Sequence, residues 1–234
     1  FYMQGGRLVV RSGTLNATEV IRASAGGTNY FIVEGGTVTA KELKMAHESL
    51  LMTFIQTGGT AIFSELGLSV QNGGRSTYCV RGGTTIVSNV LQLATANDVG
   101  AVVTVHGKDA LFSVYDSSTR GIVYAAVGNA ANTSIININD GGVFQAAAIN
   151  KYQPSYTKPY PVVVNFNGGI MKATDFNWGL LGGGQGLGGN NGPLSKVAIY
   201  EKGAAIDSNG INTETVSAIE GAGAGGIASI RLAS

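Results

Sequence analysis

The sequence predicts an all-β protein, a right-handed single-stranded parallel β-helix of about eight coils. Three observations predict it: a recurring glycine motif, an alternation of apolar and polar residues around that motif, and an unusual composition. The motif is clearest at Phe31–Met45, where an alternating run, a polar residue and Gly-Gly precede another alternating run. It returns at spacings of 23 to 35 residues, with first glycines at Gly5, Gly35, Gly58, Gly82, Gly107, Gly141, Gly168 and Gly203. A period of 20–50 residues is typical of a solenoid, and parallel crossovers are right-handed.

The alternation after each glycine corner has period 2, which is the period of a strand. The side chains expected to point inward are Leu8/Val10, Val38/Ala40, Ala61/Phe63, Thr85/Val87, Ala110/Phe112, Phe144/Ala146, Met171/Ala173 and Ile206/Ser208. Large and small residues alternate within most pairs, as a column of fixed cross-section requires. A set of antiparallel hairpins with Gly-Gly turns is the alternative, but hairpins do not require the same phase eight times.

The chain is expected to form one solenoid domain over residues 1–234. Regular coils occupy 1–106, coils with insertions occupy 107–203, and a terminal coil occupies 204–234. Good helix formers at 41–51 leave a short helix open, although the alternating copies after Gly58 and Gly82 favour a strand. Insertions are expected at 128–134, 150–161 and 179–193, and such loops often carry binding sites.

The amino end also fits the motif. Phe1-Tyr2-Met3-Gln4 resembles the strand before a corner, which predicts that Phe1 and Met3 point inward. Because this start lies inside a coil, we expect a processed portion of a longer protein.

Three positions conflict with a single phase of the motif. Aligning the glycines buries Gln56, Asn139 and Glu201. Aligning Asn137 with Asn165 buries Ile136 and Ile138 in place of Asn139, which avoids an unpaired buried amide worth about 1–3 kcal/mol. That alignment requires a one-residue bulge near Asp140. The sequence alone does not resolve Gln56 or Glu201.

Composition narrows the function classes. The chain is 44% hydrophobic and 12% charged, with 36 glycines among 234 residues and a net charge of +1. Ordinary domains carry about 25% charged residues. The near-neutral balance does not indicate nucleic acid or an anionic membrane as a partner. The single cysteine, Cys79, excludes a disulfide framework, and its position fits a small filler on a strand.

The end of the chain resembles a known family. The segment GAAIDSNG, a following threonine, an apolar stretch, GAGAGG and a short strand are similar to the autotransporter-associated β-strand repeats of bacterial surface proteins. The resemblance is strongest over residues 196–232, and the repeated GGT at Gly35, Gly58 and Gly82 is similar to the same repeats. It implies a parallel β-solenoid, secretion or display on the bacterial cell surface, and a structural or adhesive role.

Catalytic and metal-binding patterns bear on the function, because some β-helices degrade polysaccharides. The best acid/base candidates are His106, Asp109, Asp140 and, one coil away, Arg81. A solvated ladder of corner side chains explains them as well. No Cys/His spacing predicts zinc, and Asn137–Asp140 only loosely resembles calcium-binding repeats. We therefore expect no enzyme activity, no catalytic residues, no cofactor and no metal.

The insertion NKYQPSYTKPYP is the most suggestive candidate contact surface. Its prolines favour an extended loop that loses little entropy on binding, and its tyrosine rings could stack on sugars or on a protein. The candidate contact residues are Tyr152, Tyr156, Tyr160, Lys151 and Lys158. The expected function is a non-enzymatic extracellular structural or adhesive solenoid that stacks end to end with itself. The alternatives are a glycan-binding module using this loop, or a polysaccharide lyase or hydrolase resembling pectate lyase.

Overall fold

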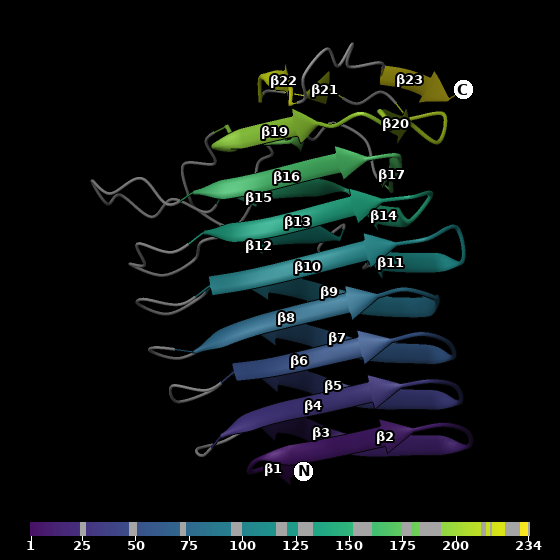
Figure 1. Cartoon of the computed structure of the whole chain (residues 1–234), viewed down its shortest axis with the longest axis vertical. Helices are drawn as coiled ribbons and strands as arrows, with labels where there is room; N and C mark the ends of the chain where they lie inside the picture. The colour runs from purple at the N-terminus through teal and green to yellow at the C-terminus, as the bar shows by residue number, and fades with distance from the viewer. Residues whose placement is uncertain are drawn as a thin grey trace.

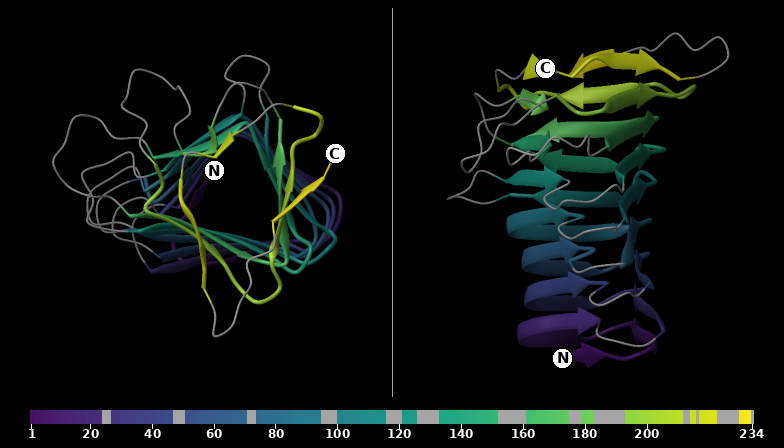
Figure 2. Two further views of the ribbon diagram at one scale, coloured as in Figure 1. Left: turned by 90° about the horizontal axis from the view of Figure 1, so that it is seen from above. Right: turned by 90° about the vertical axis from the view of Figure 1, so that its left-hand side faces the viewer.

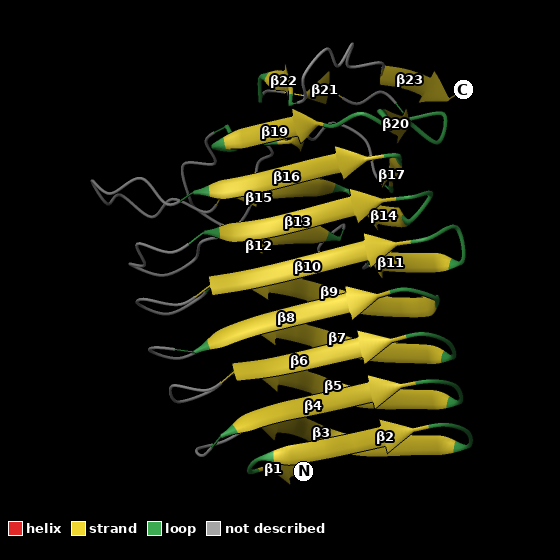
Figure 3. Cartoon of the chain, in the orientation of Figure 1, coloured by secondary structure: helices red, strands yellow, loops and turns green. Residues whose placement is uncertain are grey.

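The computed structural model of the chain is a right-handed parallel β-solenoid, as predicted (Figure 1). Strands on the near side run from left to right, and those behind return from right to left while the chain climbs from its amino end to its carboxyl end. The structure describes residues 1–23, 27–46, 51–70, 74–94, 100–115, 121–125, 133–151, 161–174, 179–182, 193–211, 214–215, 217–222 and 230–233. Every described element is a strand (Figure 3). The number of coils differs slightly from the eight predicted, since the sheet of the first wall has nine strands.

Seen from above, the solenoid has three walls (Figure 2). The first wall is a nine-stranded parallel sheet. Its strands are β2 (Gly6–Val10), β4 (Thr28–Val33), β6 (Leu51–Gln56), β8 (Arg75–Val80), β10 (Gly100–His106), β13 (Ser134–Asn139), β16 (Val162–Asn167), β19 (Lys196–Ile199) and β22 (Ile219–Gly221). In-register pairs such as Phe31↔Phe54 and Phe54↔Tyr78 place equivalent residues directly above one another.

The second and third walls belong to one 14-stranded sheet. Early in the chain one long strand bends to serve both walls: β3 (Thr14–Ala23), β5 (Thr37–Met45), β7 (Thr60–Leu68) and β9 (Gly83–Leu93). Later the second wall consists of β11 (Ala110–Val114), β14 (Val143–Ala146), β17 (Gly169–Ala173), β20 (Ala204–Asp207) and β23 (Ile230–Ala233). The third wall contains β1 (Tyr2–Met3), β12 (Ile122–Ala125), β15 (Ala148–Lys151), β18 (Gly179–Leu181) and β21 (Glu214–Thr215). The segment at 41–45 is strand, which confirms that interpretation over the helix.

A packed column of side chains fills the space between the walls. Phe54 and Tyr78 stack with ring centroids 4.2 Å apart, and Phe112 stacks on Phe144 at 5.2 Å. Tyr78 meets Phe112 edge to face at 5.4 Å, so the aromatic contacts cross from the first wall to the second. Most of the predicted inward pairs are buried, from Val38/Ala40 to Met171/Ala173. Their burial, at about 1.5–3 kcal/mol for each large side chain, is the main favourable contribution to folding.

Glycine at the corner between the first and second walls has a steric cause. Gly36, Gly59 and Gly83 all have positive φ, at 73°, 68° and 81°. A Cβ on Gly59 would lie 2.4 Å from the carbonyl oxygen of Gly36 in the coil below, and Gly83 has the same relation to Gly59. These three positions therefore exclude every side chain, both by conformation and by the close approach of successive coils.

The first corner was wrongly placed by the sequence. Leu8 pairs with Phe31 and Val10 with Val33, so the corner equivalent to Gly35-Gly36 is Ser12-Gly13. Gly5-Gly6 instead leads into β2, and Leu8 and Val10 lie on the first wall. The segment before it, β1, pairs with the end of β3 on the third wall, where Met3 is buried but Phe1 is 56% exposed. Of Phe1 and Met3, only Met3 points inward as predicted, whereas the inward direction predicted for Leu8 and Val10 is correct although their wall is not.

The three phase conflicts are resolved. Ile138 pairs with Phe166 and is buried, Asn139 faces outward, and Asp140 adopts φ 53°, which confirms the asparagine alignment. Ile199 is buried while Glu201 lies exposed in the following turn. Gln56, in contrast, does point inward.

Buried Gln56 is satisfied by a polar network inside the column. Its Nε2 donates to the carbonyls of Gly59 (3.0 Å) and Thr84 (3.1 Å), and its Oε1 accepts from Thr85 Oγ1 (2.6 Å). Tyr78 Oη lies 2.9 Å from Thr85 Oγ1. Since the Thr85 proton goes to Gln56, Tyr78 is the donor, and burial raises the pKa of the Tyr78 hydroxyl and keeps it protonated. The network links residues of two successive coils.

Candidate functional surface

The outer face of the first wall carries two columns of uncharged side chains, which we call the first-wall face. One column contains Tyr30, Thr53, Thr77, Val102, Ile135 and Val163; the other contains Ile32, Ile55, Cys79, Thr104, Asn137 and Asn165. The register of the parallel sheet sets both columns, because outward residues at i and i+2 repeat in each coil. Figure 1 looks directly onto this face.

Some polar side chains of this face hydrogen-bond to one another between neighbouring coils. Asn165 Nδ2 donates to Asn137 Oδ1 at 2.9 Å, and Asn137 Nδ2 donates to Thr104 Oγ1 at 3.2 Å. These bonds run parallel to the solenoid axis from coil to coil.

The second wall is also largely uncharged on its outer side. Thr14, Thr37, Thr60 and Thr84 form one ladder, and Leu111, Val143 and Ile170 continue it. Charged side chains appear on the outer side of this wall late in the chain, where Lys172 Nζ lies 3.5 Å from Asp207 Oδ2.

The third wall carries charge on its outer side. Lys44 Nζ lies 2.9 Å from Glu42 Oε1, and Glu65 continues the Glu42 column one coil later. At the bend into this wall, Lys41 lies 3.8 Å from Glu19. The outer side of the first wall also carries charge, at Arg7, Arg75 and Lys196, which lie at the ends of the two uncharged columns or beside them.

A cluster of ionisable side chains lies on the corner between the first and second walls. His106 Nδ1 lies 3.1 Å from Asp140 Oδ2, and Lys202 Nζ donates to Asp140 Oδ1. The intervening corner contains Gly168, whose missing Cβ would lie 3.0 Å from the Lys202 Cβ. Glycine there lets the lysine side chain pass over one coil to reach Asp140.

The electrostatics of this cluster favour an ion pair over acid catalysis. The hydrogen bond from Lys202 holds the pKa of Asp140 below its usual value, with the charges of Lys202 and His106 acting in the same direction and desolvation opposing them. A general acid needs a raised pKa. Asp140 is therefore arranged as an ionised acceptor that joins three corners.

The other predicted acid/base candidates do not join this cluster. Arg81 is exposed one coil below His106, and its backbone N–H donates to the backbone carbonyl of Gln56 at 2.7 Å. Asp109 is exposed, and its backbone carbonyl accepts from Gly83 N–H at 2.9 Å. The structure thus brings together two of the four candidates, His106 and Asp140.

The tyrosine-rich insertion lies mostly outside the described residues. This applies to Tyr152, Tyr156, Tyr160 and Lys158. Lys151 is described: it ends β15, is half-buried, and burial lowers the pKa of its ammonium group.

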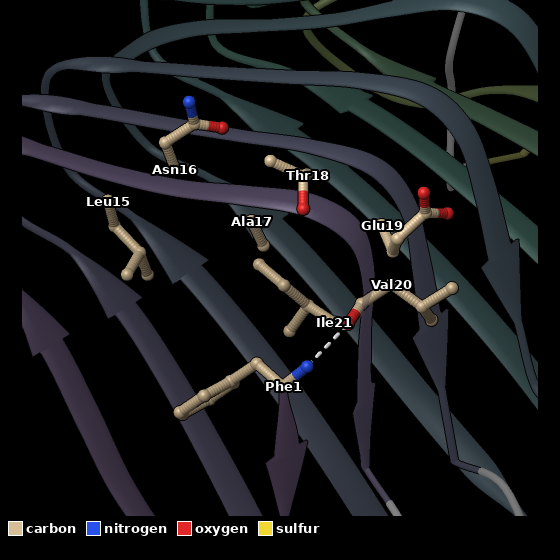
Figure 4. A pocket seen from close by; sticks show the side chains of 8 residues that line it. All are labelled: Phe1, Leu15, Asn16, Ala17, Thr18, Glu19, Val20 and Ile21. Atoms are coloured by element: carbon tan, nitrogen blue, oxygen red, sulfur yellow. Dashed lines mark hydrogen bonds between the residues drawn. The ribbon is translucent and has the colours of Figure 1, made fainter.

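An open hollow of about 250 Å³ lies beside the bend of β3 (Figure 4). Its wall is formed by Phe1, Leu15, Asn16, Ala17, Thr18, Glu19, Val20 and Ile21. The ammonium group of Phe1 donates to the Val20 carbonyl at 2.8 Å. The hollow is smaller than typical ligand pockets, and Glu19 is its single side-chain ionisable group.

The described residues contain no group of three or more His, Cys, Asp or Glu side chains placed to hold a metal ion. They also contain no helix with the length and apolarity needed to cross a membrane.

Sequence reasoning missed Lys202 and the first-wall face. The signal for Lys202 was the glycine at 168 between two corners that carry side chains. The signal for the face was the lack of charge at two outward positions, i and i+2, in each of six successive strands.

Comparison with known proteins gives no relative: no family model, no curated protein and no solved structure matches this chain.

Proposed function

We propose that this chain is a non-enzymatic structural or adhesive β-solenoid of the bacterial cell exterior. The observation that supports it is the unbroken ladder of the first wall, with a packed column inside and two columns of uncharged side chains on six of its strands outside. Nine strands at about 4.8 Å spacing extend for about 38 Å. Such a rod suits a stalk or a contact surface, and the resemblance of residues 196–232 to bacterial surface repeats agrees with this role.

Self-stacking is part of this proposal. Each coil offers the coil above it the same row of backbone groups that it receives from below, so one copy can extend the ladder of another. Head-to-tail contacts of this kind produce open filaments. Negative-stain microscopy of the purified chain tests this: rods longer than one copy support it, and short particles of uniform length contradict it.

Glycan binding through the 150–161 loop is the second hypothesis. Lys151, half-buried at the end of β15, fixes where the loop leaves the third wall. A glycan pull-down with Tyr156→Ala, and with Tyr115→Ala as an exposed tyrosine elsewhere, tests it. Binding lost only in the first variant would support the loop, and equal binding by both would exclude it.

A polysaccharide lyase or hydrolase is the third hypothesis, and the lowered pKa of Asp140 argues against its use as a general acid. Release of uronate products, assayed with and without calcium, would revive it if Asp140→Asn abolished the activity.

A further inference from the structure

We propose that the Asn209–Gly210 turn is a covalent modification site, at which the asparagine side chain loses ammonia and becomes aspartate or isoaspartate. Water is the co-reactant, and the reaction requires no enzyme. The proposal does not depend on the structural role proposed above. Three observations support it: the conformation of the turn selects this dipeptide, its peptide group has no hydrogen bond, and the other described Asn-Gly pair is held by the ladder.

The turn after β20 has the geometry that favours Asn-Gly. Asn209 and Gly210 both have positive φ, at 54° and 71°, and Ile211 N–H donates to the Ser208 carbonyl at 2.9 Å. Positive φ at both central residues of a turn favours asparagine followed by glycine. The same dipeptide is chemically reactive, because glycine has no Cβ to hinder attack by its own nitrogen on the asparagine side chain.

The reaction proceeds through a five-membered succinimide ring. The backbone nitrogen of Gly210 loses its proton to solvent and attacks Asn209 Cγ, so that a new C–N bond forms. The bond from Cγ to the side-chain nitrogen breaks, and that nitrogen takes up a proton and leaves as ammonia. Water then opens the ring. Addition at the former side-chain carbonyl gives aspartate, and addition at the former backbone carbonyl gives isoaspartate, whose main chain runs through Cγ.

The Asn209–Gly210 peptide is accessible to this reaction. Both residues are exposed, and neither the Asn209 carbonyl nor the Gly210 N–H has a hydrogen-bond partner in the part of the chain that the structure describes. A Cβ added to Gly210 would meet no atom within 4 Å, so solvent reaches this peptide. Ring closure requires the peptide to rotate out of the turn, and the backbone bond that closes the turn, from Ile211 to Ser208, is a surface bond that opens locally.

The other described Asn-Gly pair, Asn167-Gly168, is held between coils. The Asn167 carbonyl accepts from Asp140 N–H at 2.9 Å, and Gly168 N–H donates to the Gly203 carbonyl at 2.7 Å. The attacking nitrogen is therefore bonded to the next coil. Asn167 Oδ1 also accepts from Lys202 N–H at 3.1 Å. Ring closure at this pair requires the ladder itself to open, which is rarer than the opening of a surface turn.

The asparagines of the first-wall face are protected as well. Asn137 and Asn165 hydrogen-bond to their neighbours along the solenoid axis. They are followed by Ile138 and Phe166, whose branched or bulky side chains hinder attack by the backbone nitrogen. Reaction at Asn209 therefore leaves these amides intact.

Reaction changes both the charge and the backbone at the end of β20. The product adds a negative charge two residues from Asp207, whose Oδ1 accepts from Asn209 N–H at 2.8 Å and whose Oδ2 lies 3.5 Å from Lys172 Nζ. Isoaspartate also adds one methylene group to the main chain between Ser208 and Ile211. We therefore expect the modified chain to lose the bond that closes the turn, seen as faster hydrogen exchange at the Ile211 amide.

Incubation of the folded full chain in mildly alkaline heavy-oxygen water, followed by peptide mapping with mass spectrometry, tests the proposal. Heavy oxygen marks the residues that reacted with water during the incubation. We expect labelled aspartate and isoaspartate at position 209, formed at a rate on the order of tenfold or more above that at Asn167. The urea-unfolded chain is the control, because without the ladder the two pairs should react at similar rates. Asn209→Gln is the matched variant, because its longer side chain does not form the five-membered ring.

Four outcomes would overturn the proposal. They are equal labelling of Asn209 and Asn167 in the folded chain, labelling at 209 only after unfolding, labelling at 209 that persists in Asn209→Gln, and aspartate at 209 without isoaspartate. The last would indicate direct hydrolysis of the side chain without a ring. None of these results depends on whether the chain forms rods, so the failure of this proposal is distinguishable from the failure of the structural role.

Discussion

The buried network of Gln56, Thr85 and Tyr78 allows a quantitative prediction. All three side chains are fully buried, and Thr85 Oγ1 lies between the other two. Thr85→Val keeps the shape of the side chain but leaves both the Tyr78 hydroxyl and Gln56 Oε1 without their partner. Each orphaned buried group costs about 1–3 kcal/mol, so we expect Thr85→Val to lower the free energy of unfolding by about 2–6 kcal/mol.

Companion variants separate the contributions to this loss. Tyr78→Phe leaves the Thr85–Gln56 bond intact, so we expect a loss of about 1 kcal/mol. The triple variant Gln56→Leu/Thr85→Val/Tyr78→Phe removes the three polar side chains together. The Gly59 and Thr84 carbonyls lose the Gln56 donor, although Gly59 O keeps its bond from Thr84 N–H, so we expect a smaller loss than for Thr85→Val alone. Thr84→Val, on the outer side of the same strand, is the control and should change stability by less than about 0.5 kcal/mol.

Urea unfolding followed by circular dichroism measures these changes. Native-state hydrogen exchange at the Arg81 and Thr84 amides, which donate to Gln56 O and Gly59 O, localises them. A Thr85→Val variant within about 0.5 kcal/mol of wild type would refute the reasoning. So would a Tyr78→Phe variant less stable than Thr85→Val.

Three further predictions follow from the corner between the first and second walls. Gly59→Ala should be clearly more destabilising than Gly13→Ala in thermal unfolding, because both have positive φ but only Gly59 would place its Cβ 2.4 Å from a carbonyl oxygen; equal losses would contradict the packing at the corner. The lowered pKa of Asp140 means that the stability it contributes is present above its unfolded pKa of about 3.9 and is lost as the pH falls through the lower folded value. Asp140→Asn should remove that part of the acid dependence, and an unchanged pH profile would count against it. Gly168→Ala should weaken the Lys202–Asp140 contact, seen as a smaller effect of Lys202→Met in the Gly168→Ala background than in wild type; additive effects would show that Gly168 is not needed for that contact.

The repeat made most of the fold predictable. Alternation around each glycine corner identified the inward residues from Val38 to Ala173, because packing density and strand period leave few choices. The error at the first corner arose because Gly5-Gly6 matched the motif better than Ser12-Gly13. A corner needs positive φ at its second residue, which Gly13 supplies with φ 73°.

The less predictable features depend on contacts between coils. Gln56 could be placed inward only once Thr85 and Tyr78 were known to lie beside it, since a buried amide is costly without partners. Lys202 reaches Asp140 from 62 residues away across a glycine, a distance in sequence that no local pattern encodes. The lack of charge on the first-wall face was visible in the sequence, but only the strand register brings those residues onto one surface.

Spin-label distances along one outward column test the stacked ladder most directly. With Cys79→Ser as background, cysteines at Asn165 and at Ile55 or Ile32 lie four and five strands apart in the same column. The account predicts backbone separations of about 19 and 24 Å, rising by about 4.8 Å for each added strand. A second distance that does not exceed the first by about 4.8 Å would contradict the solenoid and every conclusion drawn from it.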